Sequence, residues 1–84
     1  MSAEFNQAAE DVKKLSKTPT NEEKLQLYGW FKQVNFGDVN TAKPGMFDLE
    51  GKAKWDAWNK NKGMSKEEAE KNYIQLVKQL QAKQ

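Results

Sequence analysis

The chain has 84 residues, which is enough for one domain, and a chain of this length buries only about 60–65% of the surface that its unfolded form exposes. It contains no cysteine and no histidine. This excludes a disulfide framework and removes the usual zinc ligands and catalytic nucleophiles, so we expect no metal site and no catalytic residue. Fourteen lysines, no arginine and 12 acidic residues give a net charge of only +2, far from the basic surface of a dedicated nucleic-acid-binding protein.

The sequence predicts a first helix over residues 3–15. Ser2 is suited to cap its start, and the pattern ends by Lys17, before a proline. The apolar side chains follow the i, i+3, i+4, i+7 spacing of one helical face; they are Phe5, Ala8, Ala9, Val12 and Leu15.

A second helix is predicted over residues 21–36. Thr20, followed three residues later by Glu23, has the pattern of a capping box that opens a helix. The next segment, 37–48, contains two glycines, a proline and several turn-forming residues, so it predicts an ordered loop. Its length is unusual for a small helical protein and suggests that it spans a distance or shapes a site.

The last two predicted helices cover residues 49–61 and 65–83. The second of these opens with another capping pair, Ser65 and Glu68. Four amphipathic helices without a convincing strand predict an all-α bundle in a single domain, residues 1–84. Periodicity alone does not give the order in which the helices pack.

Two segments place lysines beside aromatic rings. Tyr28 and Lys32 stand at i and i+4, so a phosphate above that face would receive a phenolic hydrogen bond and a charge-assisted bond together. Lys52 and Lys54 similarly precede Trp55. On spacing alone, the alternative reading is a buried aromatic residue next to a solvated lysine, and it is the commoner arrangement.

The first helix carries a comparable set, with Phe5, Ala9 and Lys13 along one side. The small side chain of Ala9 would leave room either for a ligand or for a closely packed helix. Tyr73 and the three tryptophans are more often core residues than a platform for a base, although so many large rings predict that at least one aromatic side chain is exposed.

Taken together, these motifs resemble the acyl-CoA-binding protein family. The resemblance covers essentially the whole chain and is most specific in Lys54-Trp-Asp-Ala-Trp58 and in the loop from Gly37-Asp38 to Lys43-Pro-Gly45. It implies four helices in an up-down-down-up arrangement, with the long loop between the second and third. It also implies a ligand, a long-chain fatty acyl-CoA thioester.

The resemblance implies roles for individual residues. Tyr28, Lys32 and Lys54 would hold the 3′-phosphate of the CoA ribose, and Lys13 would reach the other phosphates. Phe31 and Tyr73 would flank the adenine. Ala9 and Leu25 would line the groove for the acyl chain.

Three positions depart from the family pattern. Phe31 stands where tyrosine is common, so it keeps the stacking face and loses a hydroxyl. Glu50 stands where lysine is common, and a carboxylate cannot help to hold a phosphate. Lys24 replaces a residue that is often apolar, which would alter the rim of the groove.

The sequence therefore predicts a carrier of long-chain acyl-CoA that is not an enzyme and needs no cofactor. The resemblance implies a monomer that meets acyl-CoA-using enzymes transiently. A helix-mediated protein-interaction module without a small ligand is the alternative. No apolar run approaches the roughly 20 residues of a membrane span and the start lacks signal-peptide features, so we expect a cytoplasmic protein without stable membrane insertion.

Overall fold

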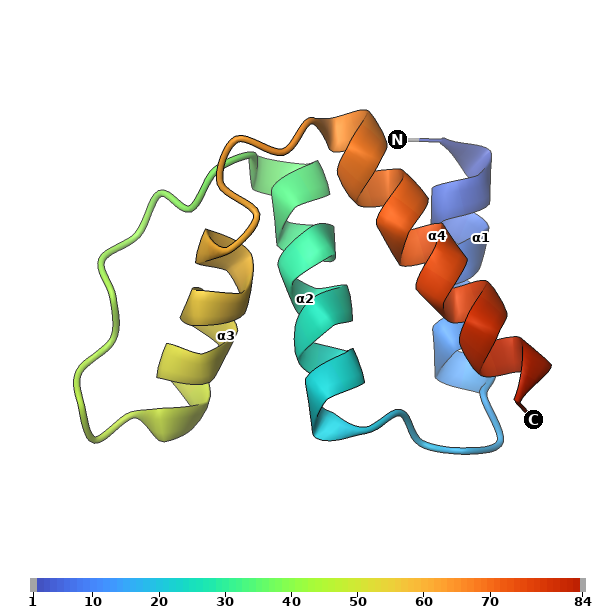
Figure 1. Cartoon of the computed structure of the whole chain (residues 1–84), viewed down its shortest axis with the longest axis horizontal. Coiled ribbons are helices and arrows are strands. Elements are labelled where there is room, and N and C mark those ends of the chain that lie inside the picture. The colour runs from blue at the N-terminus through green and yellow to red at the C-terminus, as the bar shows by residue number, and fades with distance from the viewer. Residues whose placement is uncertain (1, 84) are drawn as a thin grey trace.

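The computed structural model describes residues 2–83 and contains four α-helices in that range. Figure 1 shows that the second and third helices run in the same direction, while the first and fourth run opposite to them. This is the up-down-down-up order, so the predicted all-α fold is confirmed. The helices are α1 (Ala3–Asp11), α2 (Asn21–Phe36), α3 (Leu49–Asn59) and α4 (Lys66–Ala82).

Side-chain caps fix the start of each helix. The hydroxyl of Ser2 accepts the Phe5 N–H at 3.1 Å. Thr20 and Glu23 form the complete capping box, with bonds of 2.8 and 3.1 Å. Ser65 accepts the N–H of Glu68 at 3.1 Å, and the carboxylate of Asp48 caps α3 by accepting the Gly51 N–H at 3.0 Å. These caps satisfy donors that the first turn of a helix leaves free.

Four helix ends differ from the sequence prediction, and those of α4, at Lys66 and Ala82, differ by one residue each. The first α-helix ends at Asp11 rather than at residue 15, and the chain tightens into a 3₁₀ turn, η1 (Val12–Lys14), before Leu15 becomes extended. The third ends at Asn59, before the expected residue 61, because the next bonds are of the shorter i to i−3 type and lead into Gly63 at φ 86°. Such tightening is common at helix ends, where the last carbonyls lack intrahelical partners.

The core lies where α2 and α4 pack together and α1 covers α4. α3 packs against α2 on the other side, where Gly29 lets the helices approach so closely that an added Cβ would lie 2.5 Å from the Ala57 carbonyl oxygen. None of the helices within residues 2–83 is long and apolar enough to cross a membrane. The core is formed by the buried residues Phe5, Ala8, Leu27, Val34, Ala69, Tyr73, Val77 and Leu80.

The loop 37–48 is fastened to α3 by two tryptophans. The indole N–H of Trp58 donates to the Gly37 carbonyl at 2.8 Å, and that of Trp55 donates to the Thr41 carbonyl at 2.9 Å. These bonds give both tryptophans a structural role. The loop runs along the outer side of α3 and is held there (Figure 1).

A second connection joins the start of this loop to the turn between α3 and α4. One carboxylate oxygen of Asp38 accepts the Gly63 N–H at 2.8 Å and the side-chain N–H of Gln33 at 2.9 Å. The Gly63 bond, and after it the Gln33 bond, hold the pKa of Asp38 below its ordinary value of 3.8. The carboxylate of Asp38 is therefore favoured in the folded state.

Replacing Asp38 by Asn should lower the melting temperature at neutral pH, and the difference from the wild type should shrink as the pH falls. A depressed folded-state pKa contributes stability above the unfolded pKa, and this contribution is lost as the pH falls through the folded pKa. Thermal unfolding followed by circular dichroism from about pH 7 to about pH 3 measures this difference. A difference that stays constant over that range would show that the charge of Asp38 has no role.

Candidate functional site

Two adjoining surface depressions bring α1, η1, α2 and α4 together. They have volumes of about 350 and 460 Å³ and share the side chains of Val12, Lys13, Phe31 and Tyr73. The first depression also contains Pro19, Lys24, Leu27 and Tyr28, and the second contains Phe5, Asn6, Ala9 and Glu10. Five of the eight predicted site residues line these depressions, whereas Lys32, Lys54 and Leu25 line neither.

Three rings form the floor of this site. The ring centroid of Phe5 lies 5.0 Å from that of Tyr73 and 5.9 Å from that of Phe31, and the latter two are 6.3 Å apart. Phe5 is fully buried, whereas Phe31 is 40% exposed and presents an open face. A flat base could therefore pack on Phe31 without moving the core.

Tyr73 stays a neutral phenol in this setting. Burial raises the pKa of its hydroxyl above the ordinary value of 10.0, so the group carries no negative charge at neutral pH. It can therefore face a phosphate or a base without repelling an anion and can still donate a hydrogen bond.

The ammonium groups of two lysines lie near the ring of Tyr28. The ammonium nitrogens of Lys32, on α2, and Lys54, on α3, each lie 5.6 Å from its centroid. Because the two lysines come from different helices, the packing of α3 against α2 creates the pair. An anion beside Tyr28 would meet two positive charges and a phenolic hydroxyl.

The lysines of the site differ in their partners. Lys54 pairs with Glu50 at 3.2 Å, and Lys13 pairs with Glu10 at 3.8 Å, both at exposed positions. Lys32 has no carboxylate within 4.0 Å among residues 2–83. No carboxylate therefore neutralises the ammonium of Lys32, whereas Glu50 partly neutralises that of Lys54.

Leu25 lies apart from the other predicted residues. It lines a depression of about 430 Å³ between α2 and α3, together with Trp30, Ala53 and Ala57. Ala9 lines the depression on the α1 side, so the structure does not place Ala9 and Leu25 in one depression. Their role toward an acyl chain remains a prediction.

Sequence reasoning missed several residues that the structure adds. Val12 and Pro19 line the first depression, and Lys24, noted only for the rim, lies there too. Phe36 and Trp58 approach the ammonium of Lys32, to 4.7 and 5.5 Å from their ring centroids. The i, i+4 spacing of Lys32 and Phe36 was a signal for the first contact, whereas the contact with Trp58 depends on how the helices pack.

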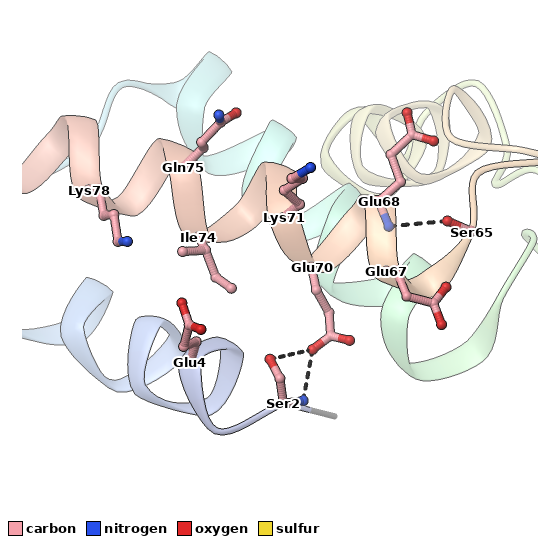
Figure 2. A pocket seen from close by; sticks show the side chains of 10 residues that line it. All are labelled: Ser2, Glu4, Ser65, Glu67, Glu68, Glu70, Lys71, Ile74, Gln75 and Lys78. Atoms are coloured by element: carbon pink, nitrogen blue, oxygen red, sulfur yellow. Dashed lines mark hydrogen bonds between the residues drawn. The ribbon is translucent and has the colours of Figure 1, made fainter.

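A larger depression, of about 750 Å³, lies between the start of α1 and α4 and contains none of the predicted site residues. Figure 2 shows Glu4, Glu67, Glu68 and Glu70 around it, with Glu70 accepting two bonds of 2.8 Å from Ser2. Its acidic lining disfavours a phosphate ligand. Within residues 2–83, no group of histidine, cysteine or acidic side chains is arranged to hold a metal ion.

The comparisons with known proteins agree with one another. The family model described as "Acyl CoA binding protein" matches residues 2–77. The chain is 58% identical over 83 residues to the acyl-CoA-binding protein homolog of Drosophila melanogaster, covering 99% of this chain and 96% of the fly protein. It is 53% identical over 83 residues to acyl-CoA-binding protein homolog 1 of Caenorhabditis elegans, with the same coverage of both chains.

Solved structures give the same result for the fold. The crystal structure of the acyl-CoA-binding protein from Moniliophthora perniciosa superposes with a TM-score of 0.91 at 44% identity, covering 99% of this chain and 83% of that one. The crystal structure of Oryza sativa acyl-CoA-binding protein 2 superposes with a TM-score of 0.89 at 50% identity, covering 95% of this chain and 89% of that one. Family model, sequence relatives and solved structures all show that the chain belongs to the acyl-CoA-binding protein family.

Proposed function

We propose that this protein binds long-chain fatty acyl-CoA thioesters and carries them in the cytoplasm. The observation that carries the proposal is that the ammonium groups of Lys32 and Lys54 both approach the ring of Tyr28, which lines the same depression as the exposed ring of Phe31. A ligand with a phosphate and a flat base, the two features of the CoA head group, is the chemistry that this arrangement suits. The names of the relatives support the same ligand class.

The proposed roles divide the site by chemistry. Tyr28, Lys32 and Lys54 hold the 3′-phosphate, and Lys13 at the rim of both depressions reaches the remaining phosphates. The adenine packs against Phe31 and Tyr73. Ala9 and Leu25 contact the acyl chain on the two sides of α2 where the structure places them, and no cofactor takes part.

The acyl chain provides most of the expected binding free energy. Burying methylene groups contributes about 0.8 kcal/mol each, so a chain of about fourteen contributes on the order of 10 kcal/mol before the entropy of binding is subtracted. A charged hydrogen bond to phosphate adds about 1.5–3 kcal/mol. Both halves of the ligand are therefore needed for tight binding.

Binding of palmitoyl-CoA should change the fluorescence of the tryptophans, because the ring of Trp58 on α3 lies 5.5 Å from the Lys32 ammonium. A saturable change with a stoichiometry of about one supports the proposal. A protein-interaction module without a small ligand, the alternative class, would show no saturable change. Absence of the change, together with absence of heat in calorimetry, would reject the proposal.

The proposal also states that the protein does not hydrolyse its ligand. The sequence offers neither histidine nor cysteine as base or nucleophile. Incubation of saturated protein with palmitoyl-CoA should release free CoA thiol no faster than buffer does, as measured with a thiol reagent. Release that scales with protein concentration would contradict this part of the proposal.

Replacing Glu50 by Gln should tighten the binding of palmitoyl-CoA by up to about five-fold, since an exposed ion pair contributes about 0.2–1 kcal/mol. Glu50 pairs with Lys54 at 3.2 Å, and a neutral amide would leave that ammonium free for the phosphate. Calorimetry at low ionic strength measures the change. Glu67→Gln, on the acidic depression of α4, is the matched control and should leave the affinity unchanged. Equal affinities of Glu50→Gln and wild type would show that Glu50 does not compete for Lys54.

A further inference from the structure

Three aromatic rings from two helices surround the ammonium of Lys32. Its nitrogen lies 4.7 Å from the ring centroid of Phe36, 5.5 Å from that of Trp58 and 5.6 Å from that of Tyr28. Tyr28 and Phe36 stand one turn before and one turn after Lys32 on α2, and Trp58 comes from α3. A cation within about 6 Å of a ring centroid is attracted by the ring's quadrupole.

Trp58 is the fixed part of this aromatic support. Trp58 is only 6% exposed, and its indole N–H is bonded to the Gly37 carbonyl at 2.8 Å. The ring of Phe36 lies 6.1 Å from that of Trp58, at an angle of 53°. Phe36 is nevertheless 57% exposed, so its ring can be changed without opening the core.

An aromatic support differs from a carboxylate in its effect on the charge. A carboxylate holds an ammonium and neutralises it, as Glu50 does for Lys54 at 3.2 Å. A ring holds the ammonium in place and leaves its N–H donors available to an anion. Lys32 is held by aromatic rings, and no carboxylate among residues 2–83 lies within 4.0 Å of its ammonium.

From this arrangement we infer that Phe36 is a positioning residue. With Trp58, it holds the Lys32 ammonium at the ring of Tyr28, which Lys54 also approaches, before the ligand arrives. It thereby favours a CoA thioester that carries the 3′-phosphate. The inference rests on the proposed function and deepens it. A side chain that is already in place loses less conformational freedom when the phosphate binds, which is the physical basis of the selectivity.

The test compares Phe36→Leu with wild type by calorimetry on palmitoyl-CoA and on palmitoyl-3′-dephospho-CoA. Leucine keeps apolar contact with Trp58 and removes the ring. We expect an affinity loss of about two- to five-fold for palmitoyl-CoA and none for the dephospho ligand, in line with the strength of an exposed cation–π contact. Phe47→Leu is the matched control, since Phe47 is 94% exposed and lines none of the depressions described above. It should bind both ligands as the wild type does.

Two further variants separate positioning from a general structural effect. Phe36→Tyr keeps a ring and should retain the wild-type selectivity. In a Lys32→Met background, Phe36→Leu should cause no additional loss for either ligand. An equal loss on both ligands, or a loss that persists without Lys32, would overturn the inference while leaving the proposed function standing. A wild-type protein that binds neither ligand would overturn the proposed function and this inference with it.

Discussion

Replacing Lys32 by Met should weaken the binding of palmitoyl-CoA by about 10- to 150-fold, because a hydrogen bond to a charged group contributes about 1.5–3 kcal/mol. Methionine keeps most of the aliphatic stem, so contacts with the surrounding rings are retained while the charge is lost. Lys32 is the lysine at Tyr28 that no carboxylate within residues 2–83 neutralises, which makes its removal the most damaging single change of charge.

Lys71→Met is the matched control for this prediction. Lys71 lies on α4 and lines the depression of about 750 Å³ (Figure 2), which contains none of the predicted phosphate-binding residues. The control should bind like the wild type, and both variants should keep the wild-type melting temperature within a few degrees. If Lys32→Met binds palmitoyl-CoA as tightly as Lys71→Met does, the assignment of the 3′-phosphate to Lys32 is wrong.

Replacing Phe5 by Ala should cost about 3–5 kcal/mol in the free energy of unfolding, the usual range for truncating a buried phenylalanine. Phe5 is 1% exposed and packs against the rings of both Tyr73 and Phe31. The total free energy of unfolding of a small domain is only about 5–15 kcal/mol, so the variant should be close to unfolding. Urea denaturation followed by circular dichroism measures the loss.

The control for the core prediction is the same substitution at an exposed phenylalanine. Phe47 is 94% exposed, and Phe47→Ala should change the free energy of unfolding by less than about 0.5 kcal/mol. Saturating palmitoyl-CoA should restore part of the stability of Phe5→Ala, because a ligand that binds the folded state alone stabilises it by mass action. Similar losses for the two alanine variants would contradict the assignment of Phe5 to the core.

The helices were predictable because their signals are local. The capping box at Thr20 and Glu23 and the apolar spacing of the first helix depend only on residues a few positions apart. The helix ends at Asp11 and Asn59 were not predictable, since tight turns that close through i to i−3 bonds carry no distinct pattern of apolar residues. The parallel course of α2 and α3 came from the resemblance, and the loop 37–48 provides the length it needs.

The candidate site divides in the same way. Tyr28 and Lys32 are one helical turn apart, so their proximity follows from spacing. Lys54 reaches the same ring only because α3 packs against α2, and spacing does not contain that information. For the same reason the approach of Trp58 to Lys32 was not predicted.

The placement of Leu25 shows a further limit. The resemblance joined it with Ala9 in one groove, yet the two residues line different depressions. The path of the bound acyl chain determines whether it contacts Ala9, Leu25 or both. Leu25→Asn and Ala9→Asn, compared for palmitoyl-CoA binding, separate these paths.

The central claim is that one site recognises the CoA head group and the acyl chain together. The most direct test is calorimetry of the full chain with palmitoyl-CoA, free CoA and palmitate under the same conditions. The account predicts that palmitoyl-CoA binds at least about 10-fold more tightly than palmitate, which lacks the charged phosphate contacts, and by a far larger factor than free CoA, which lacks the buried methylene groups. Comparable affinities for all three ligands would contradict it.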